Sequence, residues 1–290
     1  MPVQFSILIA TYNRLEYIDE LLESWLLLEP PQGGYEIILA DDGSINSPET
    51  IVQPYLNRLP LRFIKLPHRG LSSTRQCALE IAQGQYVLFT DDDCRPSPGL
   101  LRHYEQALAS SPDHAMGGPV VNLLTDNIYS ETTQAIMTYI TETWNSRGKG
   151  AAFFTASNLL FPREKLVELG GFDPTWHGTA EDRDLCRRWC EYGLPMKEVP
   201  QAIVGHAHHL NFRSFLRQHF NYGRGRWWCE QRRTKPNAGP PGWSGLPFYF
   251  KLVFYPLGRF PFLKSVAMCF LSACSQLATA AGYYKAKFSK

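Results

Sequence analysis

The chain has 290 residues, of which 44% are hydrophobic and 19% charged, so its composition excludes a disordered chain and is typical of a globular protein. Its seven cysteines are odd in number and form no Cys-x-x-Cys pair, which predicts reduced thiols and excludes a disulfide framework or a zinc ribbon. The net charge of +2 conceals an asymmetry: residues 1–212 carry 16 basic and 26 acidic residues, whereas residues 213–290 carry 13 basic residues and the single acid Glu230. This distribution predicts a catalytic body over 1–212 and a basic tail over 213–290 that meets an anionic partner.

The first 110 residues alternate predicted strands with predicted helices. Apolar runs typical of strands lie at 3–10, 35–40, 61–66 and 86–89, and predicted helices lie at 15–26, 48–59, 71–82 and 98–110. The first apolar run follows no basic region and is too short for a signal peptide, so we expect a strand there. Alternation of this kind predicts an α/β fold with a mostly parallel, doubly wound sheet.

Two of the predicted strands end directly in acids. These acids are Asp91, Asp92 and Asp93 after the run at 86–89, and Asp41 and Asp42 after the run at 35–40. In open α/β sheets, ligands bind at the carboxyl ends of the strands. Adjacent carboxylates repel unless a positive group lies between them, and hard divalent cations take oxygen ligands of this kind. We therefore predict a metal–nucleotide site centred on Asp91 and Asp93, with a solvated acidic turn as the alternative.

The pattern between residues 111 and 212 is less regular. Predicted strands lie at 115–124, 152–161 and 199–206, and predicted helices at 127–144, at 163–169 and from residue 180 onward. We expect Thr179 to cap the last of these helices and its inner face to carry Leu185, Trp189 and Tyr192. Its first turn holds Glu181 and Asp182, which either stabilise the helix dipole or belong to a functional site.

Three short patterns leave alternatives open. The turn at 146–150, Ser-Arg-Gly-Lys-Gly, is either a simple loop or a contact for phosphate or acceptor. Cys186 and Cys190 lie four residues apart and would form a metal site with a nearby histidine, although no known zinc spacing matches. The candidate histidines, which are surface residues or metal ligands, are His206, His208 and His209.

The tail is basic and aromatic throughout. We expect a helix at 212–231 with a break at the glycines of 223–228, a Pro/Gly-rich linker at 236–247, and an uncharged run at 265–284. That run is long enough to span a bilayer. Its serines, its modest hydrophobicity and the positive charges at both ends favour a helix that lies on the membrane or partly enters it. Packing against the protein itself or a second subunit is the alternative; binding of nucleic acid is not expected, because no recognised module accompanies the basic aromatic residues.

Taken together, these motifs resemble the family 2 glycosyltransferases, inverting enzymes of the GT-A fold that use a nucleotide-sugar donor. The matching segments are 7–14 (ILIATYNR), 37–44 (IILADDGS), 70–75 (GLSSTR), 89–93 (FTDDD), 170–173 (GGFD) and 181–185 (EDRDL). They cover about residues 3–230 and leave the tail unmatched. Ala10 stands where relatives often have proline or a small polar residue. The Gln-x-x-Arg-Trp signature of processive synthases is missing and the segment 224–228 is only reminiscent of it, so a single-transfer enzyme is expected.

The resemblance implies roles for the donor-side residues. It implies a nucleotide-binding half at about 1–110 and an acceptor half at about 111–212. The implied nucleotide-sugar contacts are Thr11 and Tyr12 in the base pocket, Arg14, Asp42 at the base, Arg75 at the nucleotide, Asp91 at the diphosphate through the metal, and Asp92 at the ribose. UDP is the commonest donor nucleotide among such relatives and is the expected one.

The resemblance also implies a metal and a base. Asp91 and Asp93 correspond to the Asp-x-Asp motif that holds Mg²⁺ or Mn²⁺, and His206 lies where relatives carry a histidine that completes the metal site or contacts phosphate. Asp182 matches the catalytic base and Glu181 its neighbour at the acceptor side. The acceptor is expected to be a carbohydrate or a lipid-linked sugar in the synthesis of a cell-surface polysaccharide or glycolipid, and the protein to be cytoplasmic and peripheral at the inner face of the membrane.

Three other classes of protein fit parts of the sequence. A sugar-nucleotide pyrophosphorylase would share the nucleotide-binding architecture, but its glycine-rich, arginine-containing first loop is missing. A plain membrane-interaction protein would explain the tail and leave the acidic turns unexplained. A non-catalytic nucleotide- or membrane-binding protein on a degenerate transferase fold is the main alternative, and the intact Asp91, Asp93 and Asp182 argue against it.

Overall fold

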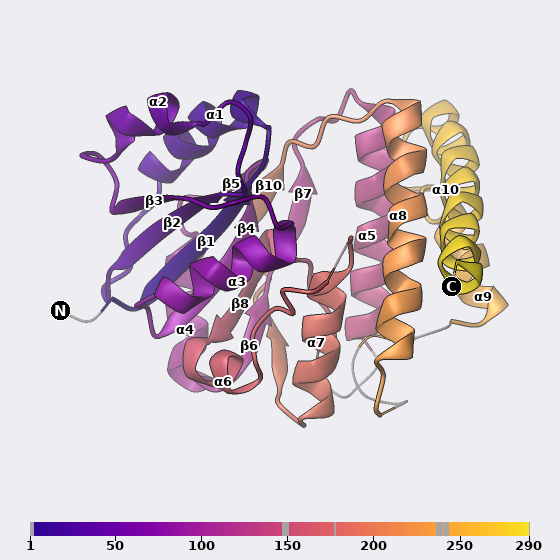
Figure 1. Cartoon of the computed structure of the whole chain (residues 1–290). Helices are drawn as coiled ribbons and strands as arrows, with labels where there is room; N and C mark the ends of the chain where they lie inside the picture. The colour runs from indigo at the N-terminus through magenta and orange to yellow at the C-terminus, as the bar shows by residue number, and fades with distance from the viewer. Residues whose placement is uncertain (1–2, 147–150, 177, 236–239, 241–243, 290) are drawn as a thin grey trace. The chain divides into compact units, whose positions relative to one another are not determined.

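The computed structural model describes residues 3–146, 151–176, 178–235, 240 and 244–289 (Figure 1). The chain forms two compact units, each assembled from three segments. Unit 1 comprises Met1–Val121, Phe154–His177 and Leu194–His206, and unit 2 comprises Asn122–Phe153, Gly178–Gly193 and Ala207–Lys290. The expected functional boundary at residue 212 stays a prediction.

Unit 1 is built on a seven-stranded sheet with the strand order β3-β2-β1-β4-β8-β6-β9. The strands are β1 (Phe5–Thr11), β2 (Tyr35–Asp41), β3 (Leu61–Lys65), β4 (Tyr86–Asp91), β6 (Ala115–Gly117), β8 (Leu159–Pro162) and β9 (Met196–Glu198). The neighbours β1–β2, β1–β4, β2–β3 and β6–β9 are parallel, and β8 runs antiparallel to β4 and β6. The predicted α/β class with a mostly parallel sheet is confirmed.

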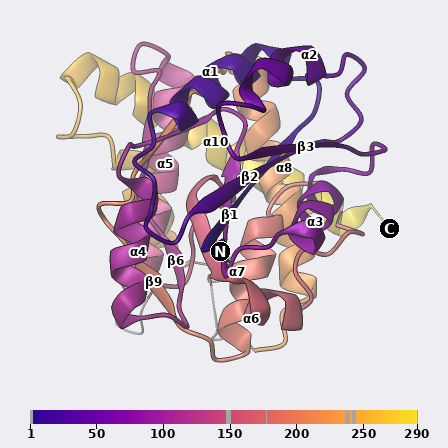
Figure 2. The same cartoon turned by 90° about the vertical axis from the view of Figure 1, so that its left-hand side faces the viewer.

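Helices cover both faces of this sheet, α1 on one face and α3 on the other (Figures 1 and 2). The helices of unit 1 are α1 (Leu15–Leu26), α2 (Glu49–Val52), α3 (Leu71–Ile81), α4 (Leu100–Ser110) and α6 (Arg163–Glu168). Side chains of a strand alternate between the two faces, so Ile7 and Ile9 join one core with Ile18 and Leu22 of α1. The burial of β1 on both faces explains its almost uninterrupted apolar sequence.

The strand register sets the position of the acidic turns. Thr11 lies opposite Asp41 on β2, and Ala10 lies opposite Asp91 on β4. The parallel strands β1, β2 and β4 therefore end side by side, which brings the residues that follow them to one edge of the sheet.

A second, three-stranded sheet has the order β5-β10-β7. Its strands are β5 (Cys94–Pro96), β7 (Val120–Asn122) and β10 (Val204–His206). β5 and β10 are antiparallel, with His206 opposite Cys94. This pairing places His206 beside Cys94, the residue that follows the acidic triplet.

Unit 2 is helical. Its helices are α5 (Ile128–Asn145), α7 (Glu181–Glu191), α8 (Phe212–Gln231), α9 (Leu246–Phe254) and α10 (Phe262–Phe288), and α8 and α10 run side by side (Figure 1). A Cβ atom on Gly282 of α10 would lie 1.9 Å from the carbonyl oxygen of Phe220, and one on Gly223 of α8 would lie 1.9 Å from that of Thr279. The glycines of the tail thus permit close helix packing, and the predicted break at 223–228 is wrong because α8 is continuous.

Several other local predictions differ from the structure. The expected strand at 115–124 is two strands in different sheets, and only Leu159–Pro162 of the run at 152–161 is a strand, preceded by a 3₁₀ turn over Ala156–Asn158. Tyr192 is 72% exposed and does not belong to the inner face of α7. The turn at 146–150 lies outside the described residues from position 147 onward.

Candidate active site

The acidic triplet lies at the carboxyl edge of the main sheet in unit 1. Asp91 is the last residue of β4, and its side chain is 28% exposed. Asp92 and Asp93 follow and are buried. Burying adjacent carboxylates is unfavourable unless cations compensate them. Unit 1 supplies such cations from three different elements.

Arg14, which precedes α1, bridges two of the three carboxylates. Its guanidinium lies 2.8 Å from Oδ1 of Asp92 and 2.5 Å from Oδ2 of Asp93, and the Thr11 hydroxyl donates to Oδ2 of Asp92 at 2.8 Å. Burial raises the pKa of Asp92 to about 7, while the Arg14 charge and the Thr11 hydrogen bond act in the opposite direction. Burial alone would lower the pKa of Arg14, but the charges of Asp93 and Asp92 raise it.

Arg75 of α3 compensates the remaining carboxylate. Its guanidinium lies 2.6 Å from Oδ1 of Asp91, and the hydroxyl of Ser157 donates to Oδ2 of the same side chain at 2.6 Å. Arg75 is itself buried, with its guanidinium 5.6 Å from the centre of the Phe172 ring. Both oxygens of Asp91 are thus held in a fixed direction by charge-assisted hydrogen bonds.

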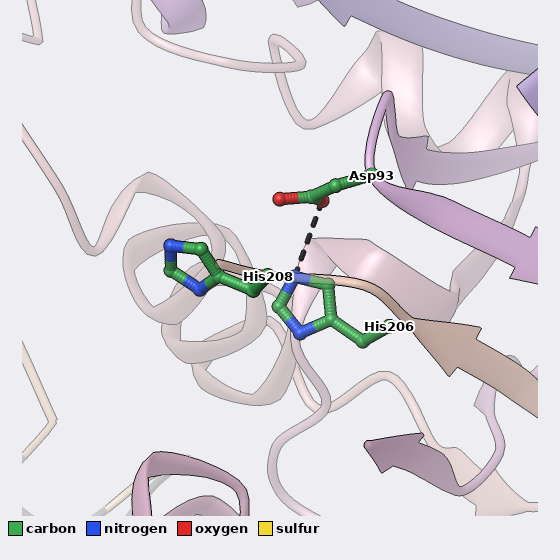
Figure 3. A group of neighbouring side chains, drawn as sticks. All are labelled: Asp93, His206 and His208. Atoms are coloured by element: carbon green, nitrogen blue, oxygen red, sulfur yellow. Dashed lines mark ion pairs between the residues drawn. The ribbon is translucent and has the colours of Figure 1, made fainter. Parts of the chain in front are cut away.

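His206 at the end of β10 pairs with the last acid of the triplet. Its Nε2 lies 3.1 Å from Oδ1 of Asp93 (Figure 3, in which the additional His208 belongs to unit 2). Burial alone would lower the pKa of His206, but the hydrogen bond and charge of Asp93, together with the charge of Asp91, raise it overall. The imidazole therefore strengthens the electrostatic balance of the acidic cluster.

The donor set of this cluster fits a hard divalent ion. Oxygen atoms of Asp91 and Asp93 and the thiol of Cys94 all lie within 4.8 Å of one another. Burial raises the pKa of the Cys94 thiol well above its usual value, so the cysteine stays protonated and is a poor ligand. Asp91, Asp93 and His206 are the residues that would hold Mg²⁺ or Mn²⁺, since carboxylate oxygens suit both.

A flat aromatic surface lies beside the end of β2 in unit 1. The ring of Tyr12 stacks on His68 with centres 4.1 Å apart and planes 12° apart. Asp42 fixes this loop, because it pairs with Nδ1 of His68 at 2.8 Å and accepts hydrogen bonds from the backbone amides of Arg69 and Gly70. Stacked rings of this kind offer a base-sized apolar surface beside the charged cluster.

The second acidic group lies in unit 2 at the start of α7. Asp182 is half-buried, and its Oδ1 accepts a hydrogen bond from the backbone amide of Arg183 at 2.7 Å. Asp184 has a structural task, since it pairs with Arg187 and Arg188 at 2.7 and 2.8 Å. Asp184 thus serves the internal ion pairs of the helix.

Two sequence expectations about this helix change. The predicted Thr179 cap is wrong: Ala180 occupies the N-cap position, and the Thr179 hydroxyl donates to the carbonyl of Asn221 in α8 at 2.8 Å. Among the described residues, neither Cys186 nor Cys190 belongs to a group of side chains close enough to share a metal ion, so the alternative cysteine site has no support.

Comparison with known proteins decides the family. A profile of the family described as Glycosyl transferase family 2 matches residues 6–170, which is more than half of the chain. The chain belongs to glycosyltransferase family 2. The resemblance inferred from the strand-end motifs is therefore confirmed.

Curated family 2 relatives are larger proteins. The chain is 26% identical over 235 residues to the chondroitin synthase of Escherichia coli, an alignment that covers 69% of this chain and 34% of the synthase. It is 37% identical over 93 residues to the poly(ribitol-phosphate) β-N-acetylglucosaminyltransferase TarS of Staphylococcus aureus, covering 31% of this chain and 16% of TarS. The chain thus spans about a third or less of the length of these relatives.

Solved structures share the GT-A fold of this family 2 member. The mannosyltransferase PcManGT from Pyrobaculum calidifontis, in complex with GDP-Man and Mn²⁺, gives a TM-score of 0.63 at 19% identity and covers 97% of this chain and 76% of its own. TarS of S. aureus in complex with UDP-GlcNAc gives a TM-score of 0.58 at 15% identity, covering 99% of this chain and 76% of its own. These likenesses confirm the predicted fold.

Unit 1 of this family 2 protein brings most of the predicted donor-side residues together. One contact network contains Thr11, Arg14, Asp92, Asp93 and His206. Arg75 pairs with Asp91, and carboxylate oxygens of Asp91 and Asp93 lie within 4.8 Å of each other. Sequence reasoning missed His68 and Ser157. His68 follows the third strand, so its position at the carboxyl edge of the sheet could have been predicted from the sequence. Ser157 could not, because the sequence was interpreted as a strand over 152–161.

Proposed function

We propose that this protein transfers a sugar from a nucleoside-diphosphate sugar to a hydroxyl group of a carbohydrate or lipid-linked acceptor. The observation that carries the proposal is that Asp93, at the carboxyl edge of the sheet, lies close to Asp91 and pairs with His206. The two complexes among the structural neighbours, with GDP-Man and Mn²⁺ and with UDP-GlcNAc, support a nucleotide-sugar donor. The chondroitin synthase and TarS relatives support a task in the synthesis of a cell-surface polysaccharide or glycolipid.

The charges of the site favour a metal–diphosphate ligand. The three carboxylates are already compensated by Arg14, Arg75 and His206. A divalent ion and the doubly charged diphosphate of a nucleotide sugar together add no net charge, so they can enter without overturning this balance. When bound, the ion would act as a Lewis acid that stabilises the negative charge of the leaving diphosphate.

The transfer itself needs a base on the acceptor side. The acceptor oxygen forms a bond to the anomeric carbon from the face opposite the diphosphate, the bond from that carbon to the phosphate oxygen breaks with its electron pair, and the nucleoside diphosphate departs. The acceptor proton passes to the carboxylate of Asp182. Arg14 and Arg75 would meet the developing phosphate charge by changing partners from carboxylate to phosphate. Inversion at the anomeric carbon follows from the single displacement.

Calorimetric titration with UDP, GDP and dTDP, with and without Mn²⁺ or Mg²⁺, tests the donor site. We expect one nucleotide to bind in a metal-dependent way and Asp93→Asn to lose that dependence. Asp113→Asn removes an acid that pairs with Lys165 on the surface of unit 1 and should bind like the wild type. If no nucleotide binds to the folded protein, the donor site is wrong and the degenerate, non-catalytic protein becomes the better description.

Transfer assays test the assignment of the base. Asp182→Asn should bind the nucleotide with unchanged affinity and transfer sugar at least about 100-fold more slowly, because it retains shape and loses the proton acceptor. The anomeric configuration of the product, read by NMR, should be opposite to that of the donor. Retention of configuration would rule out a single displacement.

The tail supports a location at an anionic membrane surface. Six large apolar side chains that α10 exposes lie along one face: Leu263, Val266, Phe270, Leu277, Tyr284 and Phe288. The serines of α10 are turned inward instead, with Ser265, Ser272 and Ser275 fully buried. The buried face also holds Met268 and Leu271, so α10 has one packed face and one exposed apolar face. An exposed apolar face of this kind is unfavourable in water and suits contact with lipid.

The same helix is better suited to lie on a membrane than to cross it. By length and composition, α10 is one helix among the described residues that is long and apolar enough to span. It packs, however, along α8, which exposes Arg213, Arg217 and Arg224. Burying these arginines in hydrocarbon would cost several kcal/mol each. With Lys285 and Lys287 exposed at its end, the helix suits the anionic cytoplasmic leaflet.

Flotation with vesicles of phosphatidylglycerol and phosphatidylcholine tests this location. The wild type should float and be released by high salt, and the double variant Phe270→Gln/Leu277→Gln should stay at the bottom of the gradient. A matched control, Leu27→Gln/Val167→Gln, removes two exposed apolar side chains of unit 1 and should float. Resistance to salt and alkaline extraction would show a membrane span instead. A wild-type dimer that fails to float would show that a second copy covers this face.

A further inference from the structure

The turn that leads into α7 adopts an unfavourable backbone conformation. Ala180 has φ 73° and ψ 24°, the left-handed region that non-glycine residues rarely occupy. Among the described residues, only Asn13 shares a positive φ without being glycine. The conformation is unfavourable for alanine, so surrounding contacts must hold it. The next two residues along the chain are Glu181 and Asp182.

The contacts that hold this turn come from α8, within the same unit. The Thr179 hydroxyl donates to the carbonyl of Asn221 at 2.8 Å. The Cys229 thiol, two helical turns further along α8, lies 3.4 Å from the carbonyl of Ala180. That carbonyl also accepts the backbone amide of Asp184 and so begins α7. Both ends of the turn are thus attached to one face of α8.

Gly225 is what allows α8 to come so close. A Cβ atom at this position would lie 2.1 Å from the carbonyl oxygen of Thr179 and 2.9 Å from Cβ of Ala180. The nearest atom belongs to the backbone, so it cannot move aside without displacing the turn. Glycine in a helix interior is destabilising relative to alanine, and here that effect is offset by a contact that fixes the entry to α7.

We propose that Gly225 and Thr179 are positioning residues that orient the carboxylate of Asp182 through the Ala180 turn. The inference rests on the proposed function of Asp182 as base. Because α7 begins at Glu181, the dihedral angles at Ala180 fix the direction in which the Asp182 side chain leaves the helix. A displacement of about 1 Å at a reacting group is enough to lower a rate by about 100-fold.

Gly225→Ala and Gly223→Ala form a matched pair that tests the proposal. Both place a methyl group against backbone, Gly225 against Thr179 and Gly223 against Thr279 of α10, so both should lower the unfolding midpoint. Only Gly225→Ala disturbs the turn. We expect its kcat to fall by about 100-fold with unchanged donor KM and nucleotide affinity, and kcat of Gly223→Ala to stay within about threefold of wild type. Equal loss of kcat in both variants would show a general packing effect and overturn the proposal.

A second pair keeps the test decisive if the glycine variants fold poorly. Thr179→Val keeps the shape and removes the hydroxyl that bonds to Asn221, while Thr179→Ser keeps the hydroxyl. We expect kcat to fall by about tenfold in the valine variant and to be restored in the serine variant; equal kcat in the two would refute the role of Thr179. Asp182→Asn distinguishes the failure of the base assignment from the failure of the positioning role. If Asp182→Asn is active, Asp182 is not the base. An inactive Asp182→Asn beside a fully active Gly225→Ala removes only the positioning role.

Discussion

His219 of α8 is expected to make the protein lose stability in mild acid. Its side chain is 2% exposed, with Nε2 3.4 Å from the Thr133 hydroxyl and the ring edge against Phe215, 4.6 Å between ring centres. Burial lowers the pKa of His219 to about 4, and the charge of His208 acts in the same direction. The imidazole is therefore neutral in the folded protein at neutral pH.

The sign of the effect follows from comparing the folded and unfolded states. The unfolded chain has a histidine pKa of about 6.5 and takes up a proton below that pH, whereas the folded protein does not do so until about pH 4. The contribution of the neutral His219 to the free energy of unfolding is fully present above pH 6.5 and is lost as the pH falls to 4. Each pKa unit corresponds to about 1.4 kcal/mol, so the total loss is on the order of 3 kcal/mol.

Urea unfolding from pH 7.5 to 4.5 at constant ionic strength measures this contribution. His219→Gln should be less stable than wild type at pH 7.5 and should lose less stability on acidification, by up to about 3 kcal/mol. His103→Gln, which changes a half-buried histidine in α4 of unit 1, should retain the pH dependence of wild type. If His219→Gln and wild type lose stability in parallel, the histidine does not titrate as described.

Three further substitutions probe the packing. Gly282→Ala should lower the free energy of unfolding by about 2 kcal/mol or more, because its methyl group meets the Phe220 carbonyl at 1.9 Å; an unchanged urea midpoint would contradict the close helix contact. Asn158→Ala should cost about 2 to 3 kcal/mol, because it strands the Tyr104 hydroxyl that donates to Asn158 at 2.7 Å. Adding Tyr104→Phe should recover part of that loss in a double-mutant cycle. Ala180→Gly should raise the unfolding free energy by about 0.5 to 1 kcal/mol in calorimetry, since glycine tolerates φ 73°, and a lower midpoint would contradict this.

The donor side of the site was predictable because its signals are local. A strand ends where its apolar run ends, and parallel strands end at one edge, so Asp91, Asp93 and Asp42 were placed at the same edge from sequence alone. The predicted bounds of β1, β2 and β4 differ from the structure by only a few residues. The ion-pair partners of these acids could not be predicted from the sequence. Arg14 was expected at the nucleotide, and its ion pairs with Asp92 and Asp93 depend on which turn faces which.

The errors concern residues whose meaning depends on a partner far along the chain. Gly223 and Gly225 look the same in a sequence whether they break a helix or admit another backbone, and only Thr279 and Thr179 decide between the two. Thr179 has the right type and place for a helix cap, yet its hydroxyl bonds to α8 instead. In each case a tertiary contact decided the conformation against the local preference of the residue, and the hydrophobic periodicity of the sequence does not indicate such a contact.

The placement of α10 also could not be predicted from its hydropathy. A core helix and a membrane-facing helix have the same average apolar content, so composition left three placements open for residues 265–284. The structure adds what composition does not contain, namely which side chains of α10 are buried and which are exposed. Ser272 and Ser275 are buried beside Leu271, while Phe270 and Leu277 are exposed, so the helix has a second, exposed apolar face that a core helix of a soluble protein does not need. Because these residues and Asp182 belong to unit 2, and Asp91, Asp93 and His206 to unit 1, variants that abolish vesicle binding should leave nucleotide binding intact. Membrane attachment would then govern which acceptor the enzyme meets, and the donor site would set which sugar it carries.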